Sequence, residues 1–304
     1  MARARFEVKP RGPFDLAATS EHFGGWGDFA GGDELSVTLA FPVEGWDACA
    51  AVTLRQTPGG NVHGDVEAAG GSGDVGARAW EQAIAVLSLD VDGAGFAAVG
   101  ARDAVIGGIQ RRYPGLRPVL FHSPYEAAAS FIIGHRISMA QGRAIRARMA
   151  EQAGIAIDTP QRSVHAFPSP QRLLELDSFA GLSAAKVERL HGVAQAALDG
   201  VLDRQRLRAL DVDDALARIR TIPGLGPFFA QGVLMRGAGL VDAVTDDEVT
   251  RQAVQRAYEL ASPPSHADVL DIAERWRPYR MWALVLLHVW LRREAGGPVR
   301  SRRR

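Results

Sequence analysis

The first hundred residues alternate between hydrophobic and polar positions in the manner of β-strands. The stretches ELSVTLAFPV and ACAAVTLRQ alternate or run apolar, are rich in β-branched residues, and are separated by glycine and aspartate clusters. The stretch GGNVHGDVEAAGGSGDVG fits either a β-hairpin or an irregular loop, a loose excursion of the chain. ARAWEQAIAVLSL has apolar residues at helical spacing. These patterns predict a small α/β domain over residues 1–102.

From about residue 103 the pattern changes to helix after helix, broken by proline and glycine. Ser123 before Pro124 is typical of an N-cap followed by proline at the first helical position. We expect helices over 103–112, 124–153, 170–176, 183–198, 204–219, 227–238, 247–260, 266–275 and 278–293. The predicted fold class is therefore α+β, with an all-helical domain over 103–296 and a disordered arginine-rich tail at 297–304.

Composition places the protein in a reducing compartment. The start, MARARFEVKPRGPFD, has no continuous apolar run, so we expect no signal peptide and no membrane anchor. The single cysteine, Cys49, excludes an intramolecular disulfide and a cluster with four cysteine ligands. Histidines lack metal-ligand spacing or partners, so no metal held by side chains is expected; they include His135, His165, His266 and His288. We expect a cytoplasmic protein.

The net charge of zero conceals an asymmetry. Residues 1–110 hold 7 basic and 15 acidic side chains, a net charge of −8, whereas residues 111–304 hold 28 and 20, a net charge of +8. Four of the later arginines lie in the tail. A basic excess indicates a polyanionic partner, or equally a solvated face with a basic tail. Charge alone does not decide between these alternatives.

The turn TIPGLGPFFAQG separates two amphipathic helices. Pro223 ends the first helix, Pro227 opens the second, and Gly224 and Gly226 permit close backbone approaches that a Cβ would prevent. Free N–H groups at such a turn form an anion site, which on DNA would hold a phosphate without reading sequence. A plain helix–helix connection is the alternative.

This turn resembles the helix–hairpin–helix of the base-excision DNA glycosylases, and residues 222–227 followed by Ala230 carry the resemblance. In that superfamily an essential aspartate follows the second hairpin glycine by roughly twenty residues. Asp246 and Asp247 lie 20 and 21 residues after Gly226. Two further blocks, RYPGLRPVLFHSPYEAAASFIIGHRISMAQGRAIRARM and WRPYRMWALVLLHVW, are similar to the 3-methyladenine DNA glycosylase II branch, as is the early Gly-Pro-Phe-Asp-Leu. The resemblance implies that Ile222, Gly224, Leu225 and Gly226 form the phosphate-binding hairpin.

The resemblance implies a carboxylate beside the deoxyribose, where positive charge develops as the bond to the base breaks. Asp247 with Arg251 fits the branch's Asp-x-x-x-Arg pattern, so we favour Asp247 as the catalytic residue. Asp246 with Val249 and Arg251 fits a second superfamily pattern and is the runner-up. Either aspartate could instead cap the helix that starts near residue 248.

Four positions are implied to line the pocket for the flipped base. Phe228 replaces the lysine of strand-cleaving relatives, which excludes a Schiff base there, and matches the branch's pocket aromatic. Gly232 stands where the family has a tyrosine, so the pocket is expected to be wider or differently filled. His288 and Trp290 compete for the family's stacking tryptophan. Core packing is the alternative for the three side chains.

Arg136, in GHRIS, falls where the family has the wedge that fills the space left by the flipped base, usually Gln or Leu. Arginine can stack on bases and contact phosphate, although a solvated helix-end residue is the alternative. No cofactor is expected apart from a monovalent cation, which the family binds through hairpin carbonyl groups.

The sequence thus predicts a monofunctional DNA glycosylase that flips out and hydrolyses alkylated, 3-methyladenine-type bases in double-stranded DNA. We expect a monomer with no membrane partner, nucleoid-associated when on DNA. Two alternatives stay open: a glycosylase for a different modified or deaminated base, and a protein that binds damaged DNA without excising a base.

Overall fold

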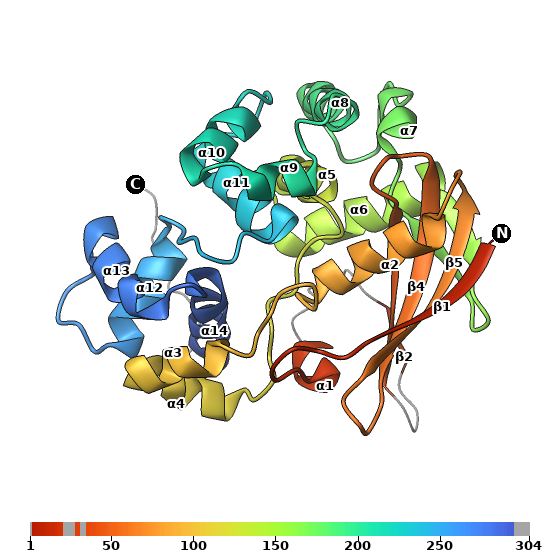
Figure 1. The fold of residues 1–304 in the computed structure, drawn as a ribbon. Coiled ribbons are helices and arrows are strands. Elements are labelled where there is room, and N and C mark those ends of the chain that lie inside the picture. Colours follow the sequence, from red (N-terminus) through yellow and green to blue (C-terminus); the bar gives the residue numbers. More distant parts are fainter. Residues whose placement is uncertain (1, 21–27, 31–34, 295–304) are drawn as a thin grey trace.

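The computed structural model describes residues 2–20, 28–30 and 35–294, so the predicted tail at 297–304 lies outside the described residues. Five strands form one antiparallel sheet in the order β1-β5-β4-β3-β2 (Figure 1). They are β1 (Ala2–Val8), β2 (Asp28–Ala30), β3 (Ser36–Pro42), β4 (Ala48–Gln56) and β5 (Val62–Gly70). The glycine-rich stretch that fitted either a hairpin or an excursion therefore contains a strand, β5.

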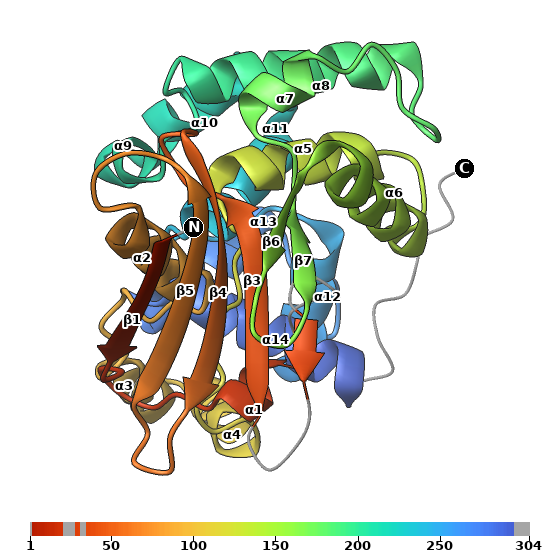
Figure 2. The same ribbon diagram turned by 90° about the vertical axis from the view of Figure 1, so that its right-hand side faces the viewer.

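The two faces of this sheet are covered by different elements. Strand β4 alternates between them: Ala50 packs in a core with Trp80 of helix α2 (Val75–Val86), whereas Ala51 points to the opposite face. There it meets Val164 of a second, two-stranded hairpin, β6 (Ile155–Asp158) and β7 (Ser163–Ala166). Figure 2 shows this hairpin lying against the sheet. The sheet is consequently buried between α2 and a hairpin from the helical half.

The helices pack as two clusters, each with its own hydrophobic core. The first cluster holds α5 (Pro124–Gly134), α6 (Met139–Ala153), α7 (Pro170–Leu174), α8 (Ala184–Leu198), α9 (Arg204–Ala209), α10 (Val212–Arg220), α11 (Pro227–Gly232) and the π-helix η1 (Val233–Ala238). The second holds α3 (Phe96–Arg102), α4 (Ala104–Arg112), α12 (Glu248–Ala257), α13 (His266–Ala273), η2 (Glu274–Trp276) and α14 (Arg280–Arg293). A short helix, α1 (Leu16–Ser20), contributes Leu16 to the core of the sheet. The α+β fold class predicted from the sequence is confirmed.

The structure corrects the predicted elements in places and confirms one predicted helix cap. The helix predicted over 124–153 is two helices, because Ser138 and Gln141 form a capping box that starts α6 anew. The predicted N-cap at Ser123 is confirmed: its side chain accepts a hydrogen bond from the Glu126 N–H at 3.1 Å. Strands β6 and β7 were not predicted, since four residues each give too short a pattern to recognise.

Contacts cross the predicted domain boundary at residue 102 in both directions. Phe96 of α3 packs edge-on against Trp282 of α14, with ring centroids 5.3 Å apart, and so belongs to the second helical core. The hairpin β6–β7, by contrast, packs on the N-terminal sheet. The division at 102 stays a prediction, and these contacts tie its two sides together.

Candidate active site

The predicted hairpin forms an exposed turn anchored by two buried side chains. Ile222 and Leu225 are 3% and 2% exposed, and the Leu225 N–H donates to the Ile222 carbonyl at 3.1 Å. Gly224 has φ = +89°, a conformation that favours glycine, and an added Cβ would lie 2.8 Å from the Arg189 side chain. Around Gly226 an added Cβ would meet no atom within 4 Å. The turn can therefore approach a partner closely.

Two amides of this turn are available to such a partner. Within the described residues, the N–H groups of Gly224 and Gly226 make no hydrogen bond, and Pro227 then opens α11. Unpaired N–H groups at a helix start attract anions, because the helix dipole adds to their partial charge. The geometry fits a bound phosphate.

A cavity of about 450 Å³ lies where the two helical clusters meet. Its wall comes from α5, α6, α11, η1 and α14, together with the residue that starts α12. The lining includes a group of aromatic and apolar side chains, four arginines and one carboxylate, that of Asp247. The four arginines are Arg143, Arg146, Arg236 and Arg292.

Asp247 is held in place as the N-cap of α12. Its carboxylate accepts hydrogen bonds from the Thr250 N–H and the Thr250 hydroxyl, both at 2.9 Å. Burial by itself would raise the pKa of this carboxyl, but hydrogen bonds from Thr245 and Thr250 and the nearby His288 lower that pKa below its ordinary value. Asp247 is therefore ionised at neutral pH although it is partly desolvated.

Asp246 takes a different position from its neighbour. It does not line the cavity; its carboxylate pairs with Arg251, and the His266 Nδ1 lies 3.7 Å away. The two adjacent aspartates are thus separated by the helix start, with one facing the cavity and the other bound in a surface ion pair. Asp247 therefore both caps α12 and lines the cavity.

His288 lies across the cavity wall from α12 and joins the same network. Its Nε2 is 3.2 Å from the Thr250 hydroxyl, which in turn donates to Asp247. Burial lowers the pKa of His288 to about 4, although Asp247 opposes this shift. The ring is therefore neutral at pH 7, and its Nε2 carries the proton, because the Thr250 proton is already donated to Asp247.

Trp290, the competing candidate, is not brought to this cavity. It is a partly buried residue packed on the second helical core. The helical period explains the difference: His288 and Arg292 are four residues apart and share one face of α14, whereas Trp290 lies on another.

The position of Gly232 is filled by a ring from another helix. An added Cβ there would lie 2.6 Å from the Phe131 ring, which occupies the space. Phe131 stacks on Phe229 with centroids 5.3 Å apart and 20° between planes, and Phe228, 58% exposed, continues the row to the mouth of the cavity. The Phe131 ring therefore takes the space beside Gly232.

Arg136 lies in the break between α5 and α6. It is exposed and has φ = +59°, and its neighbours Gly134 and Ile137 line the cavity. The adjacent His135 contacts the Phe229 ring edge-on at 5.6 Å. The predicted wedge residue therefore projects from a tight turn next to the cavity mouth.

Three residues of the site were not identified from the sequence: Arg236 and Phe131, which line the cavity, and Thr250, which bonds to Asp247. Arg236 had a usable signal, because it is a lone charge in the apolar run VLMRGAGL. Thr250 is three residues after Asp247, at the spacing of a residue that bonds back to an N-cap. Phe131 had no signal in the sequence, since only the tertiary packing brings it against Gly232.

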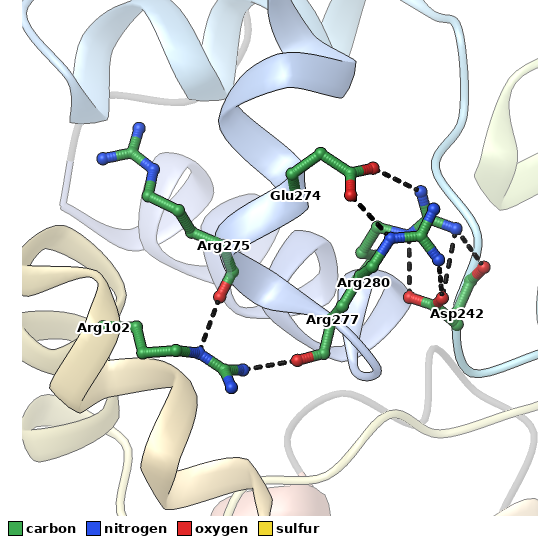
Figure 3. Close-up of polar contacts among 6 residues, drawn as sticks. All are labelled: Arg102, Asp242, Glu274, Arg275, Arg277 and Arg280. Carbon is green, nitrogen blue, oxygen red and sulfur yellow. Dashed lines mark hydrogen bonds and ion pairs between the residues drawn. The ribbon is translucent and has the colours of Figure 1, made fainter.

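An ion-pair cluster fixes the start of α14, the helix that carries His288 (Figure 3). The Arg280 Nε donates to Asp242 at 2.7 Å, and Arg277 bonds both Asp242 and Glu274 at 2.7 Å. Arg102 of α3 adds hydrogen bonds to the carbonyl groups of Arg275 and Arg277. These contacts hold α14 to the loop that leads into Asp247.

The described residues contain neither a candidate metal site nor a helix that could span a membrane. Among those residues, no group of three or more His, Cys, Asp and Glu side chains could hold a metal ion. In the same residues, every helix is too short or too polar to cross a membrane.

The chain is similar in sequence to known DNA glycosylases. No protein-family model matches the chain. It is 30% identical over 192 residues to DNA-3-methyladenine glycosylase 2 of Escherichia coli, which covers 62% of this chain and 64% of that protein. It is 24% identical over 206 residues to the DNA-3-methyladenine glycosylase of Bacillus subtilis, covering 66% of this chain and 68% of that protein.

The fold is shared over nearly the whole chain with a solved structure. The 3-methyladenine DNA-glycosylase from Archaeoglobus fulgidus matches with a TM-score of 0.73 and 19% identity, covering 95% of this chain and 98% of that one. The chain is thus similar in sequence to DNA-3-methyladenine glycosylases, spanning 64% of the length of the E. coli relative, and it shares its fold with a solved glycosylase over nearly its whole length.

Proposed function

We propose that this protein is a monofunctional DNA glycosylase that hydrolyses the N-glycosidic bond of an alkylated base in double-stranded DNA. The observation that carries the proposal is Asp247: it is the one carboxylate among the residues lining the cavity, ionised and partly desolvated. A base must leave the helix to reach such a cavity. The name of the E. coli relative, DNA-3-methyladenine glycosylase 2, supports the choice of an alkylated base.

The proposed reaction uses Asp247 at the sugar. As the bond between C1′ and the base breaks, positive charge develops on the deoxyribose, and a fixed carboxylate stabilises that charge and directs a water to C1′. The hydrogen bonds from Thr250 hold the carboxylate in one orientation before the substrate arrives. Phe228, in place of a lysine, offers no amine for a Schiff base, which supports hydrolysis without strand cleavage.

The proposed DNA contacts lie on two exposed turns. The free amides of Gly224 and Gly226 would hold a backbone phosphate, and the exposed Arg136 would fill the space left by the flipped base. The carbonyl groups of Thr221 and Gly224 accept no hydrogen bond within the described residues and are the groups that a monovalent cation would bind. We propose further that the protein acts as a cytoplasmic monomer on nucleoid DNA.

The test is base release from duplex oligonucleotides containing 3-methyladenine-like, 7-methylguanine, hypoxanthine or uracil lesions. We expect wild type and Asp246→Asn to release a base and Asp247→Asn to fail, with DNA binding retained in both variants. Release lost in Asp246→Asn alone would transfer the catalytic role to Asp246. Salt-dependent binding with no release from any lesion would identify a protein that recognises damaged DNA without excising a base.

A further inference from the structure

Both carboxylate oxygens of Asp247 are held by a single residue, Thr250. Oδ1 accepts a hydrogen bond from the Thr250 N–H and Oδ2 accepts one from the Thr250 hydroxyl, each at 2.9 Å. The N–H is fixed by the backbone of α12, because it belongs to the first turn of that helix. The hydroxyl proton, by contrast, rotates to suit its neighbours. The orientation of Oδ2 therefore depends on the groups that direct this hydroxyl.

The Thr250 hydroxyl has three polar neighbours. It lies 2.9 Å from Oδ2 of Asp247, 2.8 Å from the Thr245 hydroxyl and 3.2 Å from Nε2 of His288. A hydroxyl has one proton to donate and two lone pairs that accept. A carboxylate only accepts, so the proton goes to Asp247, and the lone pairs are left for donors at Thr245 and His288. Thr250 is 0% exposed, so solvent cannot easily replace a donor that is lost.

His288 is the donor committed to this hydroxyl. Burial lowers the pKa of its ring to about 4, so the ring is neutral at pH 7 and one nitrogen carries a proton. Only the tautomer with the proton on Nε2 can donate to Thr250. The other tautomer would present a lone pair there and draw the Thr250 proton away from Asp247. Thr245 cannot take over this task fully, because its hydroxyl also bonds to Asp247 and has a single proton.

These contacts join α12, which carries Thr250, to α14, which carries His288. We propose, on the basis of the proposed glycosylase function, that His288 is a positioning residue for base excision. Its Nε2–H holds the Thr250 hydroxyl, and that hydroxyl holds Oδ2 of Asp247 in the orientation that the reaction requires. His288 competes for the position of the family's stacking tryptophan, and in this chain that position serves the carboxylate.

Positioning and stacking require different chemistry at residue 288. Positioning requires an N–H that reaches Thr250, whereas stacking on a flipped base requires an aromatic face. His288→Gln keeps an N–H donor and removes the aromatic face, and His288→Phe does the reverse. The two substitutions therefore give opposite results for the two roles.

The experiment measures single-turnover base release at saturating enzyme, on the lesion that wild type releases fastest, and the enzyme concentration that gives half-saturation. His288→Phe should lower the rate by about tenfold to a hundredfold while half-saturation changes by less than about twofold, because the carboxylate is misplaced and DNA binding is not. His288→Gln should restore the rate to within about threefold of wild type. Trp290→Phe, on another face of α14, is the matched control and should leave the rate unchanged.

A double-mutant cycle tests whether His288 acts through Thr250. Thr250→Val keeps the shape of the side chain, removes the hydroxyl, and should lower release at least as much as His288→Phe. The double variant should be no slower than Thr250→Val alone, because the chain of hydrogen bonds is already broken. Losses that multiply would overturn the proposal, since they would indicate independent roles. Activity kept in His288→Phe and lost in His288→Gln would also overturn it, because stacking gives that pattern.

A measurement on the protein without DNA separates this proposal from the glycosylase function. NMR shifts of the ring nitrogens report which nitrogen of a histidine carries the proton, and the His288 signals are assigned by their loss in His288→Gln. At pH 7 we expect a proton on Nε2, none on Nδ1, and a changed Nε2 shift in Thr250→Val. These results should hold even if no lesion is released, in which case only the glycosylase function fails. A proton on Nδ1 would overturn the positioning role whatever the activity.

Discussion

The two ends of α14 carry arginines in opposite situations. At its start, Arg277 and Arg280 are neutralised by Asp242 and Glu274 within hydrogen-bonding distance (Figure 3). Toward its end, Arg292 faces the cavity together with Arg236 of η1, and neither forms an ion pair among the described residues. The start of α14 is therefore held by paired charges, and we call these ion pairs the anchor. Its end faces a cavity whose arginines Arg236 and Arg292 lack carboxylate partners among the described residues.

The paired arginines serve the stability of the fold, whereas the unpaired arginines serve binding. Paired charges with good geometry hold elements together, whereas an unpaired charge in a partly buried wall costs stability and becomes useful only when a ligand supplies the missing partner. The anchor at Asp242 fixes the orientation of α14, and so fixes His288 against Thr250. Changes at the anchor should therefore affect unfolding, and changes at the cavity should affect base release.

The largest effect is expected at Asp247. Asp247→Asn should lower base release by a factor on the order of 10³ or more, because the charge that stabilises the deoxyribose is lost. Single-turnover release at saturating enzyme checks this. Asp246→Asn is the control, since Asp246 pairs with Arg251 outside the cavity. Similar losses in both variants would show that the cavity does not discriminate between the two aspartates.

A pH effect on stability follows from His288. Its pKa falls from an ordinary 6.5 to about 4 in the folded protein, so its neutral form contributes stability above pH 6.5 that is lost as pH falls toward 4. The loss is about 3 kcal/mol at 1.36 kcal/mol per pKa unit. Urea unfolding of wild type and His288→Gln at pH 7 and pH 4 measures it. Equal pH dependence in both proteins would contradict the assignment of a neutral, partly buried ring.

The paired and unpaired arginines should respond differently to neutral replacements. Asp242→Asn should lower the free energy of unfolding by about 2 kcal/mol, because the Arg280 side chain is only 13% exposed and would lose the shorter of its two ion pairs. Arg236→Met should change it by less than about 1 kcal/mol, since removing an unpaired charge offsets the lost bond to Val119. Equal destabilisation by the two substitutions would remove the distinction between anchor and cavity.

The smallest effects are expected from alanine substitutions at two glycines, Gly232 and Gly226. Gly232→Ala should cost about 1 kcal/mol of unfolding free energy, because its Cβ would push the Phe131 ring toward the cavity. Gly226→Ala has open space around it and should keep its stability, while weakening binding to undamaged duplex DNA. Denaturant unfolding and fluorescence anisotropy measure the two effects. A stability loss at Gly226 without weaker DNA binding would contradict its exposure to a partner.

Ordered motifs in the sequence carried the prediction further than charge or composition did. The α+β class followed from the change of hydrophobic period near residue 103, and the glycine-rich turn was located because proline and glycine determine backbone geometry locally. Both aspartates fit a pattern of the superfamily, and Asp247 was favoured because its pattern belongs to the branch that the rest of the chain resembles. Phe131 against Gly232 and Thr250 beside His288 could not be predicted, because these pairs are brought together by helices distant in sequence.

The hairpin β6–β7 also has a chemical consequence for the single thiol of the chain. It covers the face of β4 that carries Cys49, which is 5% exposed, and burial raises the pKa of that thiol to about 11. Electrophiles attack the thiolate and not the protonated thiol. The one thiol of the chain is thus both covered and protonated, and we expect it to react slowly with the alkylating agents whose damage the protein is proposed to repair.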